Sequence, residues 1–279
     1  MLDRFYSNIK NHIHLMHIPV KYRHTEFHLH DFFEIYIFLN GNAKYFIEKT
    51  IYPLSFGDIL ITNNTEIHKS VVIPGKIYDI ISIQINPELI KELNSKNYNL
   101  LNCFINRPNG KNNKILLPKK DIDNFLLLLN NIESVYNSTS AGNEILLVSL
   151  IMQLLIILNK NFKGSNTNYE NILIPYNLIP ILEYIDFYLY DDLSLDTLEK
   201  KFNINKYYLS RLFKTTFNST IHEYIIFKRL SIAKRLLKNG KNVTEACHLS
   251  GFNDYSHFIR IFKNHFGISP GQFKKYNKN

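Results

Sequence analysis

The chain has few cysteines and no long uninterrupted apolar run. Its 279 residues include only Cys103 and Cys247, which fall in different predicted domains. This excludes a fold held by a disulfide framework and fits a reducing cytoplasm. No apolar segment follows the first charged residues, so we expect no signal peptide. The most apolar run, Ile145 to Leu158, is interrupted by Ser149 and Gln153. It is too short to cross a bilayer core of about 30 Å, so we expect a buried helix and no membrane partner.

The positive charge is concentrated in one part of the chain. A length of 279 residues predicts two domains rather than one. Residues 176–279 contain 16 Lys and Arg against 9 Asp and Glu, a net charge of +7. Residues 1–175 contain 17 against 15, a net charge of only +2. A basic C-terminal segment fits a largely sequence-independent attraction to the phosphates of a nucleic acid.

The basic segment contains an internal repeat. A shift of 49 positions aligns two sets of basic and apolar residues: Arg211, Phe213, Lys214 and Phe217 with Arg260, Phe262, Lys263 and Phe266. The apolar members recur at helical spacing, and a turn residue follows each copy, Asn218 in the first and Gly267 in the second. A duplication of this length indicates two copies of one supersecondary element.

Each copy predicts two short helices separated by a tight turn. In the first, Ser194 and Asn205 are placed to cap successive helices, with Asn203 at the turn. In the second, Gly251 is the turn residue, and Asn253 or Asp254 caps the helix that follows. Helix, turn and helix is the helix-turn-helix layout, whose second helix enters the major groove of DNA. Two helical hairpins that only pack together are the alternative.

Three stretches within Leu193 to Tyr276 form a distinctive pattern: Tyr208 to Lys214, Arg229-Leu230 and the run from Gly251-Phe252 to Ser269-Pro270. In these stretches the last hundred residues resemble the DNA-binding domain of the AraC/XylS family of bacterial transcription regulators. The chain departs from the family pattern at Glu199, Ala246-Cys247 and Ser250. The resemblance implies an α+β chain with an N-terminal cupin-like sensor and a C-terminal all-α domain of two helix-turn-helix motifs. It also implies a cytoplasmic activator that binds double-stranded promoter DNA, contacts RNA polymerase and forms a homodimer.

The outward positions of the two reading helices are the predicted DNA contacts. They are Asn205, Lys206, Tyr207, Ser210, Arg211 and Lys214 in the first helix, and Asp254, Tyr255, Ser256, His257, Arg260 and Lys263 in the second. Arg211 and Arg260 are predicted to contact guanine or phosphate, since arginine forks onto guanine O6 and N7. Lys214 and Lys263 are predicted to contact phosphates. A long helix, 221–238, joins the two motifs and sets their separation.

Residues 1–100 predict short strands at regular spacing, which favours a small barrel or jelly roll. Asn40-Gly41 is a strong hairpin signal between two of these strands. Residues 119–162 then predict an antiparallel helix pair. The resemblance to the AraC/XylS family implies that such a pair supplies a dimer contact, and the alternative is that it only packs on the barrel. The predicted domains are therefore 1–165 for the sensor, 166–175 for the linker and 176–279 for DNA binding.

The predicted barrel carries histidines at a recognisable spacing. His28, His30 and Glu34 precede Gly41, and His68 follows Gly57 by eleven positions, which resembles the two cupin motifs. In cupin metalloenzymes these histidines and the glutamate bind one metal ion, and imidazole with carboxylate suits Mn, Fe, Ni or Zn.

We favour a different use of these residues, because regulators of this architecture commonly use the barrel as a small-molecule pocket without catalysis. The pocket residues would be His28, His30, Glu34, Tyr36 and His68, with a sugar among the effectors and no cofactor. The alternatives are a metal-binding cupin enzyme fused to a DNA-binding domain, and a regulator whose barrel only dimerises.

Overall fold

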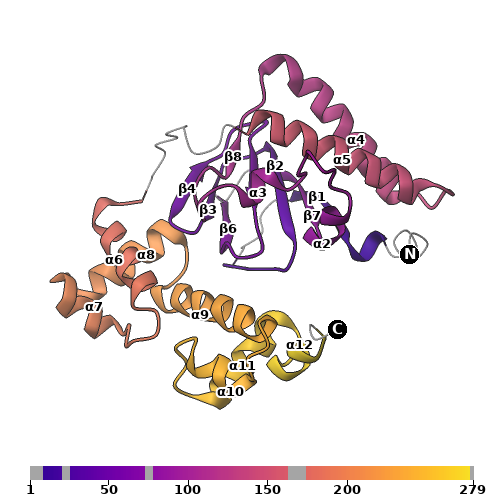
Figure 1. Ribbon diagram of the computed structural model, residues 1–279. Helices are drawn as coiled ribbons and strands as arrows, with labels where there is room; N and C mark the ends of the chain where they lie inside the picture. Colours follow the sequence, from indigo (N-terminus) through magenta and orange to yellow (C-terminus); the bar gives the residue numbers. More distant parts are fainter. Residues whose placement is uncertain (1–8, 21–25, 73–77, 163–173, 277–279) are drawn as a thin grey trace. The chain divides into compact units, whose positions relative to one another are not determined.

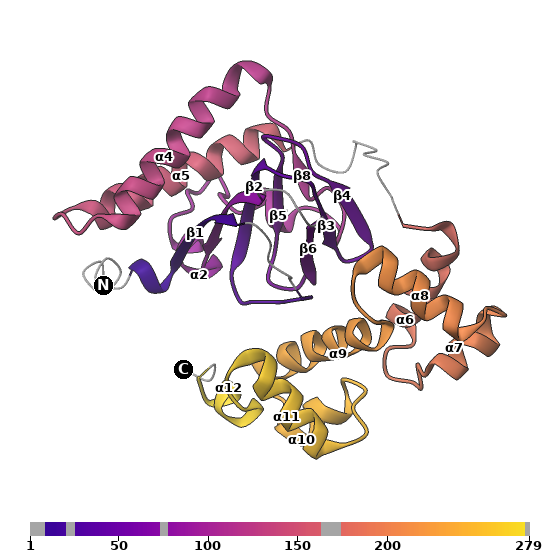
Figure 2. The same cartoon turned by 180° about the vertical axis from the view of Figure 1, so that it is seen from behind.

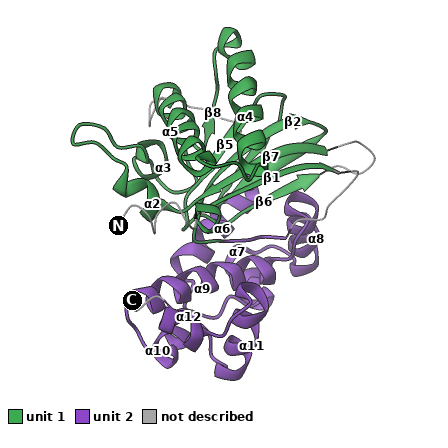
Figure 3. Cartoon of the chain, turned by 90° about the vertical axis from the view of Figure 1, so that its right-hand side faces the viewer, with its two compact units in different colours: residues 1–25, 30–173 green, residues 26–29, 174–279 purple. Residues whose placement is uncertain are grey.

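The computed structural model describes residues 9–20, 26–72, 78–162 and 174–276. The chain divides into two compact units, residues 1–25 with 30–173 and residues 26–29 with 174–279 (Figures 1 and 3). Most of the predicted linker, 166–175, lies outside the described residues. The grouping of segment 26–29 with the second unit was not predicted from the sequence.

The first unit is built on two antiparallel sheets. The larger has the strand order β1 (Ile13–Val20), β7 (Tyr78–Ile85), β2 (Phe33–Asn40), β5 (Ile59–Thr62) and β8 (Lys114–Ile115). The smaller has the order β4 (Thr50–Pro53), β3 (Ala43–Ile47) and β6 (His68–Val72). Helical segments complete the unit: η1 (Ile9–Asn11), α2 (Pro87–Glu92), α3 (Asn102–Ile105), η2 (Lys119–Asp121), α4 (Ile122–Asn137) and α5 (Asn143–Asn161).

The turn at Asn40-Gly41 exists, but the prediction that it closes a hairpin is wrong. β2 pairs with β5 and β7, whereas β3 pairs with β4 and β6, so the turn passes the chain from one sheet to the other. The register of β2 shifts between Phe38 and Asn40, and Gly41 has a φ of 126°. This irregular backbone, which glycine tolerates, turns the chain away from its own strand.

The large sheet has an apolar layer on each face. Alternate residues of β2 point to opposite faces. Phe33, Ile35 and Ile37 belong to the core shared with the helices, and Tyr36 and Phe38 belong to the core shared with the small sheet.

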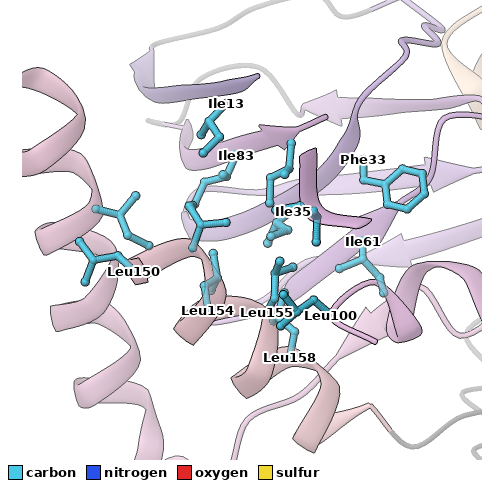
Figure 4. Close-up of a cluster of buried hydrophobic side chains, with 14 of the residues drawn as sticks. Ile13, Phe33, Ile35, Ile61, Ile83, Leu100, Leu150, Leu154, Leu155 and Leu158 are labelled. Atoms are coloured by element: carbon cyan, nitrogen blue, oxygen red, sulfur yellow. The ribbon is translucent and has the colours of Figure 1, made fainter. Parts of the chain in front are cut away.

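Figure 4 shows the core shared with the helices, where isoleucines of the sheet meet leucines of α5. Each fully buried side chain of this size contributes about 1.5–3 kcal/mol. Among the described residues, α5 is the one helix long and apolar enough to span a membrane. Its side chains Leu147, Leu150, Leu154 and Leu158 are buried in this core, as predicted for a core helix.

The second unit is helical. Its elements are η4 (Tyr176–Leu178), α6 (Ile179–Phe187), α7 (Leu195–Phe202), α8 (Lys206–Phe217), α9 (Ile221–Lys238), α10 (Val243–His248), α11 (Tyr255–Phe266) and α12 (Pro270–Tyr276). α9 has the predicted bounds and begins in a capping box formed by Thr220 and Glu223. It runs from the first pair of helices to the second in both views (Figures 1 and 2).

Candidate nucleic-acid interface and sensor site

The first motif consists of α7, a turn at Asn203 and α8. The side chain of Ser194 accepts a hydrogen bond from the Thr197 amide at 3.3 Å and so caps α7. Asn203, which was predicted to lie at the turn, has a φ of 48° and so adopts the left-handed conformation. Asn205 accepts hydrogen bonds from the amides of Tyr207 and Tyr208 at 3.0 and 3.1 Å. Asn205 is therefore the N-cap of α8, a structural role beside its predicted contact with DNA.

The second motif repeats this construction with α10, a turn at Gly251 and α11. Asn242 and Glu245 form a capping box at the start of α10. Gly251 has a φ of 87°, and Gly267 ends α11 with a φ of 74°. Of the two caps that the sequence allowed, Asp254 is the one used, since its carboxylate accepts from the His257 amide at 2.9 Å. This bond and the nearby positive charges hold the pKa of Asp254 below its usual value.

The buried faces of the two second helices match. Leu209 and Phe258, which are 49 positions apart, are both fully buried. The rings of Phe213 and Phe217 lie 4.5 Å apart by their centroids, and the equivalent rings of Phe262 and Phe266 lie 4.6 Å apart. The repeated apolar pattern therefore forms a repeated core, which fixes the faces that α8 and α11 present to solvent.

Those solvent faces also match. Tyr207, Arg211 and Lys214 are exposed at helical spacing on α8. Forty-nine positions on, Ser256, Arg260 and Lys263 are exposed at the same spacing on α11. We call these six residues the paired exposed stripes.

The remaining predicted contacts lie beside the stripes. Tyr255 is exposed, and Ser210 and His257 are partly buried. Lys206 Nζ lies 2.5 Å from Asp196 Oδ1, so part of its charge is paired within the motif. Tyr208, which was not among the predicted contacts, is 42 % exposed at the start of α8.

The predicted pocket residues of the first unit converge between the two sheets. Glu34 on β2 meets two rings through one oxygen, since Oε2 lies 3.1 Å from His30 Nε2 and 2.9 Å from His68 Nε2. The other oxygen, Oε1, accepts a hydrogen bond from Ser82 Oγ at 2.5 Å. Tyr45 stacks on the His68 ring. The structure thus brings together residues that are distant in the chain.

The charges of this cluster are strongly coupled. Burial on its own raises the pKa of Glu34, but its bonds with His30 and His68 and their charges hold that pKa well below its usual value. Burial lowers the pKa of His68, but the bond and charge of Glu34 outweigh it, and the pKa is raised. A buried carboxylate is thus kept ionised by its imidazole neighbours.

Tyr36 has its hydroxyl against that of Tyr78, and burial raises the pKa of both phenols. His28 lies in segment 26–29, which is grouped with the second unit, and its Nδ1 lies 3.0 Å from the Glu26 carbonyl. Its membership of the pocket stays a prediction. A pocket of about 300 Å³ lies elsewhere, between η1 and the connection from α4 to α5, where Tyr136 and Asn143 line it.

Comparison with known proteins identifies both units. Residues 19–155 match the AraC-like ligand binding domain, and residues 198–276 match a helix-turn-helix domain. A helix-turn-helix type transcriptional regulator from Pseudoalteromonas carrageenovora is 30 % identical over 42 % of this chain and 68 % of its own length. The chain belongs to the AraC/XylS family.

Two further AraC/XylS relatives are named regulators. The Msm operon regulatory protein of Streptococcus mutans is 29 % identical over 56 % of each chain. The transcriptional activator RhaR of Mannheimia succiniciproducens is 24 % identical over 92 % of this chain and 91 % of its own length. The chain thus spans little more than half the length of the first and nearly the whole of the second.

One residue that the sequence did not single out for function ties the two AraC/XylS motifs together. Arg229, on α9, donates to the carbonyls of Leu189 at 2.9 Å and Asp191 at 2.7 Å, just before the first motif. A Cβ added at Gly251, the turn of the second motif, would lie 2.7 Å from the same Leu189 carbonyl. Arg229 and Gly251 therefore form a clamp between the motifs. In the sequence, Arg229 counted only as part of the Arg229-Leu230 match to the family pattern, which gave no role for its side chain.

The second unit also contains a buried aromatic from far upstream. Phe27 is almost fully buried, and its ring lies 5.6 Å from that of Tyr224 and 6.1 Å from that of Phe227, both on α9. An isolated phenylalanine in the sequence gave no sign of this contact.

Proposed function

We propose that the chain is a sequence-specific DNA-binding regulator that activates transcription in response to a small molecule. The paired exposed stripes carry the proposal. Each stripe places an arginine and a lysine one turn apart on the second helix of a helix-turn-helix motif, where bases and phosphates are contacted. The net charge of +7 in residues 176–279 adds the attraction to DNA.

The length of α9 supports reading by both motifs at once. Its 18 residues span about 27 Å at 1.5 Å per residue. Successive major-groove faces on one side of DNA are about 34 Å apart. The clamp of Arg229 and Gly251 further fixes the motifs relative to each other, so that one unit reads two adjacent turns of promoter DNA.

The first unit is the proposed sensor. The effector binds beside the buried polar cluster of His30, Glu34, Tyr36 and His68, with His28 as a further contact, and sugars are the first class to test. The relatives named as regulators support a regulatory rather than a catalytic role. Binding alters how the DNA-binding units of a homodimer are presented to the promoter and to RNA polymerase in the bacterial cytoplasm.

The helix pair α4 and α5 supports the homodimer. Leu127 on α4 is 59 % exposed, and Ile145 and Leu146 on α5 are also exposed. Large apolar side chains gathered on one helical hairpin suit a self-complementary contact.

The proposal is tested by selecting, from random double-stranded DNA, the sequences that the purified chain binds. Binding to the selected sequence is measured at fixed salt for the wild type, for Arg260→Ala and for Lys120→Ala. Arg260→Ala is expected to lose about 1–3 kcal/mol of binding free energy and to relax base preference at one position. Lys120→Ala removes the same charge from an exposed site in the first unit and is expected to bind as the wild type does.

If Arg260→Ala retains wild-type affinity and base preference, the assigned reading face of α11 is wrong. If no sequence is enriched above bulk DNA, the proposed function itself is wrong.

A further inference from the structure

The cluster of His30, Glu34 and His68 has an arrangement that a pocket for a small organic molecule does not need. The three ligand atoms lie within 4.8 Å of one another, and both imidazole Nε2 atoms are directed at the same oxygen, Glu34 Oε2. All three residues belong to the first unit. The cluster is well buried, with His68 fully enclosed and the side chain of His30 18 % exposed.

The opposite nitrogen of each ring fixes its tautomer. His30 Nδ1 lies 2.9 Å from the carbonyl oxygen of Phe32, and His68 Nδ1 lies 2.8 Å from that of Glu66. A carbonyl oxygen only accepts hydrogen bonds, so each Nδ1 carries the hydrogen. In a neutral imidazole the Nε2 then presents a lone pair, and both lone pairs face a carboxylate that also only accepts.

Three groups with electron pairs to donate therefore meet at one buried point, and their charge is balanced by a cation among them, either a proton on an imidazole or a bound metal ion. Metal-ligating histidines usually donate one ring N–H to a backbone carbonyl or carboxylate and bind the ion through the other nitrogen. We propose that His30, Glu34 and His68 form a binding site for a divalent first-row transition metal ion.

The spacing agrees with this assignment. Nitrogen and carboxylate ligands lie about 2.0–2.2 Å from such an ion, so two ligands at right angles lie about 3.0 Å apart. The two distances from Glu34 Oε2 are 3.1 and 2.9 Å. Two histidines and one carboxylate make up the facial ligand set of iron(II) sites, and the same donors bind Mn, Ni and Zn, whereas Ca and Mg prefer oxygen alone.

Neighbouring side chains orient the ligand atoms of this cluster. Ser82 donates to Glu34 Oε1 and so turns Oε2 towards the rings. Tyr45 stacks on His68 at an interplanar angle of 15° and restrains that ring. His30 is the most exposed of the three ligands, so it marks the side from which an ion reaches the cluster.

The regulatory meaning of this site rests on the proposed function. Three protein ligands leave coordination positions open on the ion, and an effector with hydroxyl or carboxylate oxygens is suited to fill them. The ion would then be part of the sensor rather than part of an enzyme.

The test uses the full chain, produced without a histidine tag, and cobalt(II) as the probe. Metal content is measured by mass spectrometry after purification, and cobalt(II) is titrated into chelator-treated protein while its visible absorption is recorded. One ion per chain is expected, with a saturable ligand-field band. His30→Ala and Glu34→Gln are expected to weaken binding more than about 100-fold, because losing a residue that only orients a ligand already costs about 10–100-fold.

His248→Ala is the matched control, because it removes an exposed histidine from the second unit and is expected to bind cobalt(II) as the wild type does. Circular dichroism reports whether each variant folds. If the variants do not fold, the wild-type titration still decides the question. No saturable binding by the wild type, or equal binding by a folded Glu34→Gln variant, overturns the proposal.

DNA binding by the same preparations separates this proposal from the proposed function. Wild-type protein that binds the selected DNA but no metal refutes only the metal site.

Discussion

Gly251→Ala is expected to destabilise the second unit more than the same change at another glycine of equal backbone conformation. Gly251 has a φ of 87°, and a Cβ there would lie 2.7 Å from the Leu189 carbonyl and 2.9 Å from Arg229 Nε. The left-handed conformation costs a non-glycine residue about 1–2 kcal/mol. The contact adds about 1–3 kcal/mol, as overpacking does in a close-packed core. The expected loss of unfolding free energy is thus about 2–5 kcal/mol.

The carbonyl that the new Cβ meets cannot easily move away. Leu189 O accepts a hydrogen bond from Arg229 Nε, and Arg229 also holds the carbonyl of Asp191. Relief of the contact therefore breaks a charge-assisted hydrogen bond or opens the turn. Either change loosens the clamp between the motifs, so affinity for a two-turn DNA site is expected to fall as well.

Gly240→Ala is the matched control. Gly240 also has a φ of 87°, but a Cβ there meets no atom within 4 Å. It is expected to cost only the conformational part, about 1–2 kcal/mol. Urea unfolding followed by circular dichroism measures both variants, since the chain has no tryptophan for fluorescence. A neutral surface substitution usually changes the unfolding free energy by no more than about 0.5 kcal/mol. If the losses of Gly251→Ala and Gly240→Ala differ by no more than this amount, the steric reasoning is wrong.

Two further predictions concern charged side chains, a buried ion pair in the first unit and the partly buried Arg229 in the second. Glu66→Gln leaves the Arg107 guanidinium buried without its counter-charge and is expected to cost the first unit about 3–5 kcal/mol in urea unfolding. Burial raises the pKa of Glu66, but Arg107 and two backbone amides outweigh it and hold the pKa below its usual 4.5. The ion pair therefore contributes its full stability to the wild type above about pH 4.5, and this contribution is lost as the pH falls through the depressed pKa of Glu66. The stability of Glu66→Gln is expected to lack this dependence on acid pH. Arg229→Met keeps the apolar stem but loses the bonds to Leu189 and Asp191, and it should weaken binding to a two-motif DNA site more than to a half-site. Equal losses on both sites would contradict the clamp.

Local chemistry made the second unit predictable. The bounds of α9, the left-handed turns at Asn203 and Gly251 and the cap at Asn205 all follow from residues within a few positions of each other. A helix forms its backbone hydrogen bonds within one segment, so the residues that start and end it lie beside it in the sequence.

The strands of the first unit were harder to predict, because a strand depends on a partner that is remote in sequence. β1 contains Pro19 and two histidines three positions apart, His14 and His17, and no strand was predicted there, yet it pairs with β7 in continuous register from Ile13 to Val20. It lies at the edge of the large sheet, where a proline is tolerated. β4 and β8 are too short to show the alternation of apolar and polar residues that marks a strand. The passage of the chain from the large sheet to the small one at Gly41 depends on which strands pair with β2, and these are remote in sequence.

The sequence by itself determined the chemistry of this protein: a duplicated helix-turn-helix with a basic face, and an ordered set of histidines and glutamate. It also set which residues of β2 share a face, since strand side chains alternate. Only the tertiary structure decided that His68, from the small sheet, meets Glu34, from the large one, and that Arg229 links the turn at Gly251 to the carbonyl of Leu189. Spacing along a chain fixes neighbours within one helix or strand, whereas contacts between elements depend on how the whole core packs.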